Sequence, residues 1–84
     1  MPELSRFYGI VIKMYFAATE HNKPHIHAIY GEYMGSIDIY ERKMIVGDLP
    51  QKALRMIYEW IDINEEELID IWNTQKIRKI SPLK

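Results

Sequence analysis

The sequence predicts an α+β fold, in which an antiparallel sheet of about four strands is followed by two C-terminal helices packed on one of its faces. Two observations lead to this prediction. Large apolar side chains recur at every second position up to about residue 46, which is the spacing of a strand with one buried face. From Pro50 to Arg78 they recur at helical spacing instead, as on a helix that covers a core. The expected order of elements is therefore β-β-β-β-α-α.

Turn residues divide the first half of the chain into four segments of alternating hydrophobicity. Strands are expected at residues 7–16, 25–30, 36–40 and 44–46. Gly31-Glu32 has the composition of a two-residue hairpin turn, with glycine at a position that needs a positive φ. If this turn joins the second strand to the third, His25 lies opposite Asp38. In the same register, His27 lies opposite Ser36. A shift by one residue would bury both Ser36 and Asp38, so other registers are disfavoured.

Two helices are expected in the second half. Pro50 suits the first turn of a helix, where a backbone N–H has no partner within the helix. Asn64 is the expected N-cap of the second helix, because Glu67 three residues later can complete a capping box. Trp60 and Trp72 lie on the apolar stripes of the two helices and are expected in the core. The helices should cover the sheet face that carries Ile10, Ile12, Ile26, Ile37 and Ile39.

Length and composition restrict the class of protein. A chain of 84 residues that is 48% hydrophobic and 27% charged is expected to form one globular domain, residues 1–84. Its 11 basic and 12 acidic residues give a net charge of −1, whereas a protein that binds nucleic-acid phosphates generically is more basic. Since the sequence has no cysteine, disulfides, thiolate zinc sites and thiol nucleophiles are excluded. We expect a cytoplasmic protein without membrane contact or a DNA-binding motif, because the sequence shows no signal peptide and no apolar run long enough to span a bilayer.

The sheet face away from the helices carries the candidate functional residues. If the first hairpin is centred on His21, Tyr15 faces His27. The same centre places Lys13 opposite Ile29. The polar and aromatic side chains expected together on this face are His25, His27, Asp38, Ser36, Tyr15 and Lys13. We call this face the open face and these six residues the open-face cluster.

One interpretation of the open-face cluster is catalytic. An imidazole titrates near neutral pH, and orientation by Asp38 would suit it to act as a general acid or base. Lys13 or Arg6 would stabilise an anionic group. A ribonuclease that works without a metal needs these parts and no cofactor. In this interpretation the catalytic residues are His25, His27 and Asp38.

Two other interpretations remain open. In the metal interpretation, His25 and His27 point the same way from alternate strand positions, and Asp38 or His21 is the third ligand. In the other, the cluster is a polar sheet face that meets a partner chain. Its cross-strand His–Asp pair would then contribute only about 0.2–1 kcal/mol.

Several short motifs, taken together, resemble a known family. They are Pro2-Glu3-Leu4-Ser5-Arg6-Phe7-Tyr8-Gly9-Ile10, Pro24-His25-Ile26-His27, Tyr30-Gly31-Glu32-Tyr33, Leu49-Pro50 with Ala53-Leu54, and Glu59-Trp60-Ile61. The family is the small prokaryotic domain of unknown function 4160, and the resemblance covers almost the whole chain. Lys23, where a second proline is usual, and Ile26, where phenylalanine is usual, depart from the pattern.

The resemblance implies a stand-alone bacterial or archaeal protein. Relatives are often encoded beside another small protein, as in toxin–antitoxin pairs, which makes RNA a candidate target. We therefore expect a cytoplasmic component of a toxin–antitoxin-like module, an endoribonuclease or a toxin that interferes with translation, acting through His25, His27 and Asp38. The alternatives are a non-enzymatic interaction module and a metal-binding protein. The expected partner is a neighbour-encoded small protein, or a second copy that associates through the open face.

Overall fold

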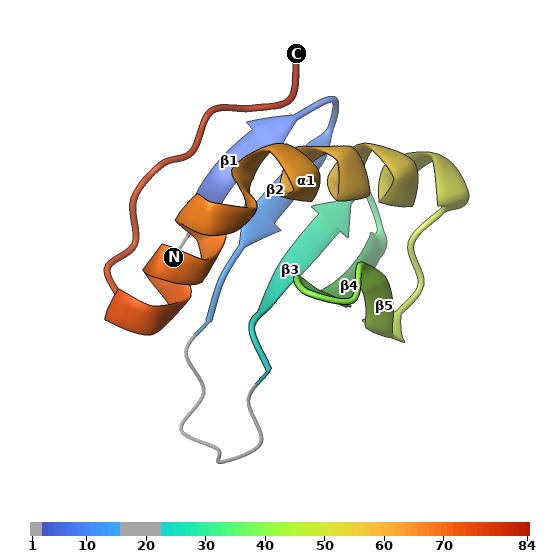
Figure 1. Ribbon diagram of the computed structural model, residues 1–84. Helices are drawn as coiled ribbons and strands as arrows, with labels where there is room; N and C mark the ends of the chain where they lie inside the picture. The colour runs from blue at the N-terminus through green and yellow to red at the C-terminus, as the bar shows by residue number, and fades with distance from the viewer. Residues whose placement is uncertain (1–2, 16–22) are drawn as a thin grey trace.

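A computed structural model of the chain describes residues 3–15 and 23–84. A five-stranded antiparallel sheet in the order β1-β2-β3-β4-β5 carries one long helix on one face (Figure 1). The elements are β1 (Glu3–Phe7), β2 (Ile10–Lys13), β3 (His25–Tyr30), β4 (Tyr33–Asp38), β5 (Lys43–Gly47) and α1 (Gln51–Thr74). The α+β class and the antiparallel sheet are confirmed, but there are five strands where about four were expected and one helix where two were. No helix in these two ranges is long and apolar enough to cross a membrane.

The extra strand arises because the first predicted strand is broken by a tight turn. Tyr8 and Gly9 both have positive φ, 50° and 81°, and they join β1 to β2 so that Phe7 lies opposite Ile10. The turn was missed because Tyr8 is a large side chain at the position where alternation requires one. As a result, Phe7 is buried with its ring centroid 5.6 Å from that of Trp60. The alternation expected over residues 7–16 predicts Phe7 on the open face, opposite to the side of Ile10 and Ile12, and this prediction is wrong.

The hairpin of β3 and β4 has the predicted register. Tyr30 pairs with Tyr33 across the turn, and His25 and Asp38 are partners at its far end. Gly31 has a φ of 62°, as the predicted turn requires. The preceding hairpin differs, because Lys13, rather than Tyr15, lies opposite His27. A shift of two residues leaves the faces unchanged, so the core still contains the expected side chains. Those fully buried on this face are Ile10, Ile12, Ile26, Ile37 and Ile39.

The two predicted helices are one helix with a kink at Asn64. Its φ and ψ of −116° and 19° are not helical. Its side-chain amide donates a hydrogen bond to the carbonyl oxygen of Trp60, 2.9 Å away, rather than capping a new helix through Glu67. Such competition with the backbone is a recognised cause of helix bending. The helix ends at Thr74, where the following Gln75 adopts the left-handed conformation and its N–H binds the carbonyl of Ile71.

Arg42 ties the turn after β4 to the kink of α1. Its guanidinium binds the carboxylates of Asp62 and Glu65, which flank Asn64, at 2.7 and 2.5 Å. It also donates to the carbonyl of Ile39. Burial lowers the pKa of Arg42, but the hydrogen bonds with Glu65 and Asp62 outweigh burial and raise it. The guanidinium therefore stays charged and holds the sheet to the helix.

The C-terminal tail covers the outer edge of β1. It runs beside β1 in Figure 1, and the N–H of Ile80 donates to the carbonyl of Leu4 at 2.8 Å. Ile80 is buried. Trp60, fully buried as predicted, donates its indole N–H to the carbonyl of Ser81 at 2.8 Å. Trp72, by contrast, is only partly buried. The tail therefore joins the core and protects one edge of the sheet.

Candidate functional site

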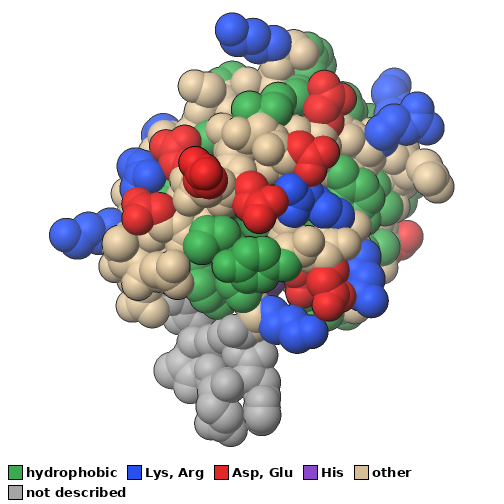
Figure 2. Space-filling view, viewed as in Figure 1, with side chains coloured by type: hydrophobic (Ala, Val, Ile, Leu, Met, Phe, Trp, Pro, Cys, Tyr) green, Lys and Arg blue, Asp and Glu red, His purple; other side chains and the backbone are tan. Residues whose placement is uncertain are grey.

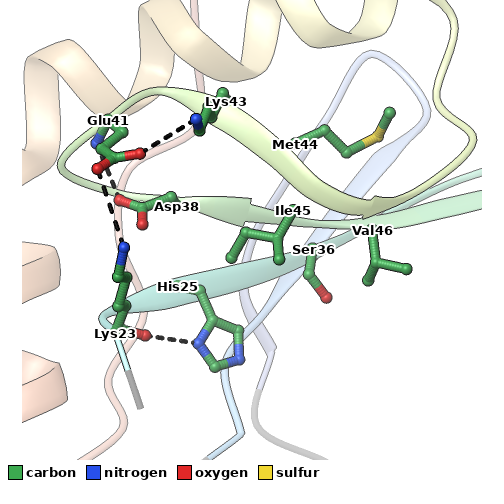
Figure 3. A pocket seen from close by; sticks show the side chains of 9 residues that line it. All are labelled: Lys23, His25, Ser36, Asp38, Glu41, Lys43, Met44, Ile45 and Val46. Atoms are coloured by element: carbon green, nitrogen blue, oxygen red, sulfur yellow. Dashed lines mark hydrogen bonds and ion pairs between the residues drawn. The ribbon is translucent and has the colours of Figure 1, made fainter. Parts of the chain in front are cut away.

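The candidate site is a hollow on the open face, beside the first residues of β3. Its volume is about 670 Å³, within the range of roughly 300–1,000 Å³ that is usual for small-molecule sites. The side chains around it come from β3, β4, β5, the turn between β4 and β5, and the segment just before β3 (Figure 3). They are Lys23, His25, Ser36, Asp38, Glu41, Lys43, Met44, Ile45 and Val46. The side that carries α1 is different in character, because acidic and basic side chains are interspersed across it (Figure 2).

His25 is held in one tautomer. Its Nδ1 lies 2.7 Å from the carbonyl oxygen of Lys23. A carbonyl only accepts, so Nδ1 carries the proton and Nε2 of the neutral ring has a free lone pair. The His25 ring centroid is 5.1 Å from that of Trp72 and 5.2 Å from that of His27. The ring is thus anchored through Nδ1, and within residues 3–15 and 23–84 its Nε2 has no hydrogen-bond partner.

His27 is held in a similar way and, like His25, is half-buried. Its Nδ1 lies 3.3 Å from Oγ of Ser36, its cross-strand partner. The ring also makes an edge contact with Tyr15, with 4.8 Å between centroids. Burial lowers the pKa of His27 below its usual value, and the charge that His25 can carry lowers it further. His27 is therefore mostly neutral at pH 7 and can accept a proton.

Asp38 does not play the part expected of it. Its Cα is paired with that of His25, as predicted. The carboxylate, however, accepts a hydrogen bond from the backbone N–H of Glu41 at 2.8 Å, and the side chain is buried. Among the described residues, the hydrogen-bond partner of the His25 ring is the carbonyl of Lys23. Asp38 thus shapes the turn after β4, which is an Asx-type role.

The basic residues near the site differ in whether they form an ion pair with a carboxylate. Lys13 lies directly opposite His27 on the neighbouring strand. Lys23 and Lys43 both pair with Glu41, at 3.9 and 3.5 Å. Arg6, the alternative cation, pairs with Glu3 at 2.9 Å on β1. Lys13 is therefore the candidate cation on the strand next to His27, while Lys23 and Lys43 line the hollow itself.

The metal interpretation finds no third ligand in the residues that the structure describes. No group of three histidine, cysteine or acidic side chains in residues 3–15 and 23–84 could hold a metal ion. His21, one of the two predicted third ligands, lies outside the described residues. The other, Asp38, has its carboxylate bound in the turn.

A second hollow and an apolar rim adjoin the histidines and were not expected from the sequence. The hollow has a volume of about 300 Å³, and its lining includes Tyr15, His27, Met34 and Val46. Met34 and Val46 are 61% and 65% exposed, and Ile45 on β5 is 54% exposed. Ile45 and Val46 lie together at a bulge in β5. No pattern in a single sequence indicates this bulge, since residues 44–46 resemble an ordinary buried strand.

Comparison with known proteins identifies one family. A family model described as "Domain of unknown function (DUF4160)" matches residues 9–73, which agrees with the resemblance in the sequence motifs. The matched range contains β2 to β5 and nearly all of α1, and thus both histidines of the site. No curated protein and no solved structure matches the chain.

Proposed function

The chain belongs to the DUF4160 family, and we propose that it is the RNA-cleaving member of a cytoplasmic, toxin–antitoxin-like two-protein module. The observation that carries the proposal is the pair of anchored imidazoles. Each ring is bound through Nδ1, and their centroids are 5.2 Å apart on one sheet face. Two imidazoles held in this way supply a base and an acid for a phosphodiester.

The environment of each ring supports a separate role. His27 has a lowered pKa and is the base. Its Nε2 takes the proton of the ribose 2′-hydroxyl as that oxygen attacks the phosphorus. The bond from phosphorus to the 5′-oxygen breaks, and the leaving oxygen takes a proton from Nε2 of protonated His25. The products are a 2′,3′-cyclic phosphate and a free 5′-hydroxyl, so protons and electrons balance without a further reactant.

The remaining residues of the site serve binding and position. Lys13 is opposite His27 and suits stabilisation of the negative charge on the phosphoryl oxygens. Ser36 holds the His27 ring. Asp38 is a positioning residue, because it acts through the turn that lines the hollow.

The test is cleavage of a labelled single-stranded RNA by the purified protein in the presence of EDTA. We expect products that end in a cyclic phosphate, and no cleavage of the same oligonucleotide with deoxyribose throughout. His25→Ala and His27→Ala should each lower the rate by about 100-fold or more, as is typical for loss of a general acid or base. Gln51→Ala, at the exposed start of α1, is the control and should leave the rate unchanged. Intact RNA, or cleavage that EDTA abolishes or that survives both histidine substitutions, would overturn the proposal.

A second candidate function, a non-enzymatic interaction module, is favoured by the exposed apolar side chains beside the histidines. Expression in a bacterial host separates the two candidates. A toxin should arrest growth when expressed alone, and neither the His25→Ala/His27→Ala variant nor co-expression with the neighbour-encoded protein should do so. Normal growth in every case, together with co-purification of the neighbour, would leave only the interaction module.

A further inference from the structure

One edge of the sheet is covered by another segment of the chain, and the other edge is exposed. The edge at β1 is covered by the tail, whose Ile80 binds Leu4. At the other edge, β5 is hydrogen-bonded to β4 alone among the described strands. Its side chains are unusually apolar for a bare edge, since Ile45 and Val46 are 54% and 65% exposed. An exposed apolar edge strand is a template for pairing with another strand.

The bulge in β5 changes which faces its side chains occupy. Val46 pairs with Ser36 and Met44 with Ile37, which leaves Ile45 as the inserted residue. Met44 packs against the core. Ile45 and Val46, although adjacent in sequence, both line the hollow on the open face (Figure 3). Two neighbouring apolar side chains therefore share one face, which a regular strand does not allow.

We propose that two copies of this chain associate by antiparallel pairing of their β5 strands. If the two-fold axis is perpendicular to the sheet, two residues paired across the β5 strands must have their side chains on the same face of the joined sheet. Because of the bulge, the register that meets this condition places Ile45 opposite the partner's Val46. Met44 then lies opposite the partner's Gly47.

Charge supports the same register. Two positions from the pair of Ile45 with the partner's Val46, Lys43 lies opposite the partner's Asp48. Both side chains are exposed, and the symmetry forms this pair twice. Opposite charges directly across from each other stabilise an antiparallel pair, whereas like charges destabilise it. The segment Lys43–Asp48 is thus complementary to itself, which selects a second copy as the occupant of the edge.

The dimer would place two candidate sites on one surface. The two five-stranded sheets become one continuous sheet with both α1 helices on the same side. Ile45 and Val46 of each copy would line the boundary between the two hollows. The inference rests on the β5 edge alone and does not depend on RNA cleavage.

Sedimentation of the purified full chain tests the association. Wild type should sediment as a dimer at tens of micromolar, and Val46→Lys should raise the dissociation constant by about 100-fold, because a charge on the edge opposes strand pairing. Ile63→Lys is the matched control, since Ile63 is 68% exposed on α1 and lies beside the C-terminal tail, which covers the other edge. Circular dichroism should show that both variants are folded. A monomeric wild type, or equal effects of the two substitutions, would overturn the proposal.

Two further experiments test the register. Asp48→Lys turns two attractive pairs into repulsive ones and should weaken the dimer by about tenfold. Added salt should partly restore that variant, whereas it should weaken the wild type. Because the chain has no cysteine, mixed Lys43→Cys and Asp48→Cys chains should give a disulfide-linked heterodimer. Either variant alone should cross-link far less, and equal cross-linking in all three samples would refute this register.

Discussion

Replacing Gly47 by alanine should destabilise the protein more than any other glycine substitution in the sheet. Gly47 pairs with Gly35 where β5 follows its bulge, and its φ is 125°. A Cβ added at Gly47 would lie 2.3 Å from Cα of Gly35 and 2.5 Å from the carbonyl oxygen of Met34. Both atoms belong to the backbone, so no change of rotamer can relieve the contact.

The magnitude follows from two independent costs. A residue with a side chain held in a sparsely populated positive-φ region costs roughly 1–3 kcal/mol. Forcing an extra methyl group into a packed site costs roughly 1–3 kcal/mol more. We therefore expect Gly47→Ala to lower the free energy of unfolding by about 2–6 kcal/mol, a large part of the total for a small domain.

Two other glycines provide graded controls. Gly31 has a φ of 62°, but an added Cβ would meet no atom within 4 Å, so Gly31→Ala should cost only the left-handed backbone, about 1–2 kcal/mol. At Gly35 an added Cβ would meet Sδ of Met44 at 3.0 Å, and Cδ1 of Leu49 and the carbonyl oxygen of Val46 at 3.1 Å. The two side-chain atoms can move, and the backbone contact is longer than the two shortest ones at Gly47, so Gly35→Ala should fall between the other two. Urea unfolding followed by circular dichroism measures all three, and a Gly47→Ala loss no larger than that of Gly31→Ala would refute the reasoning.

Three further predictions concern side chains. Ser5→Ala should raise the unfolding free energy by about 1 kcal/mol, because the buried Oγ has no partner in the part of the chain that the structure describes. Ser36→Ala is the control: it removes a hydrogen-bond partner of His27 and should not raise the unfolding free energy. Asp38→Ala should cost about 1–2 kcal/mol in the same denaturation assay, whereas Asp38→Asn keeps an acceptor for the N–H of Glu41 and should cost less than half as much. The wild type should become less stable as pH falls through the usual histidine range, since a lowered pKa of His27 means that the unfolded chain binds the proton more readily. Thermal melts of His27→Gln should show a shallower loss, and equal slopes in the two proteins would contradict the lowered pKa.

Local patterns in the sequence were sufficient for the β3–β4 hairpin. A two-residue turn with glycine leaves one register in which Ile26 and Ile37 both face inward, and that register alone places His25 opposite Asp38. The same argument failed for the first strand. Tyr8 continued the apolar alternation across a turn, so periodicity could not reveal the break before β2.

What the sequence by itself determined was which face each side chain of β3 and β4 occupies, because alternation and turn chemistry act between near neighbours. Only the tertiary structure decided what those side chains bind. The carboxylate of Asp38 could bind His25 or the N–H of Glu41, and the fold of the turn gives it the second. The bulge that turns both Ile45 and Val46 toward the open face arises where β5 meets Ser36 and Ile37 of β4. The partner of Asp38 and the position of the bulge both depend on contacts between different segments of the chain. Hydrophobic periodicity along one strand carries no information about such contacts.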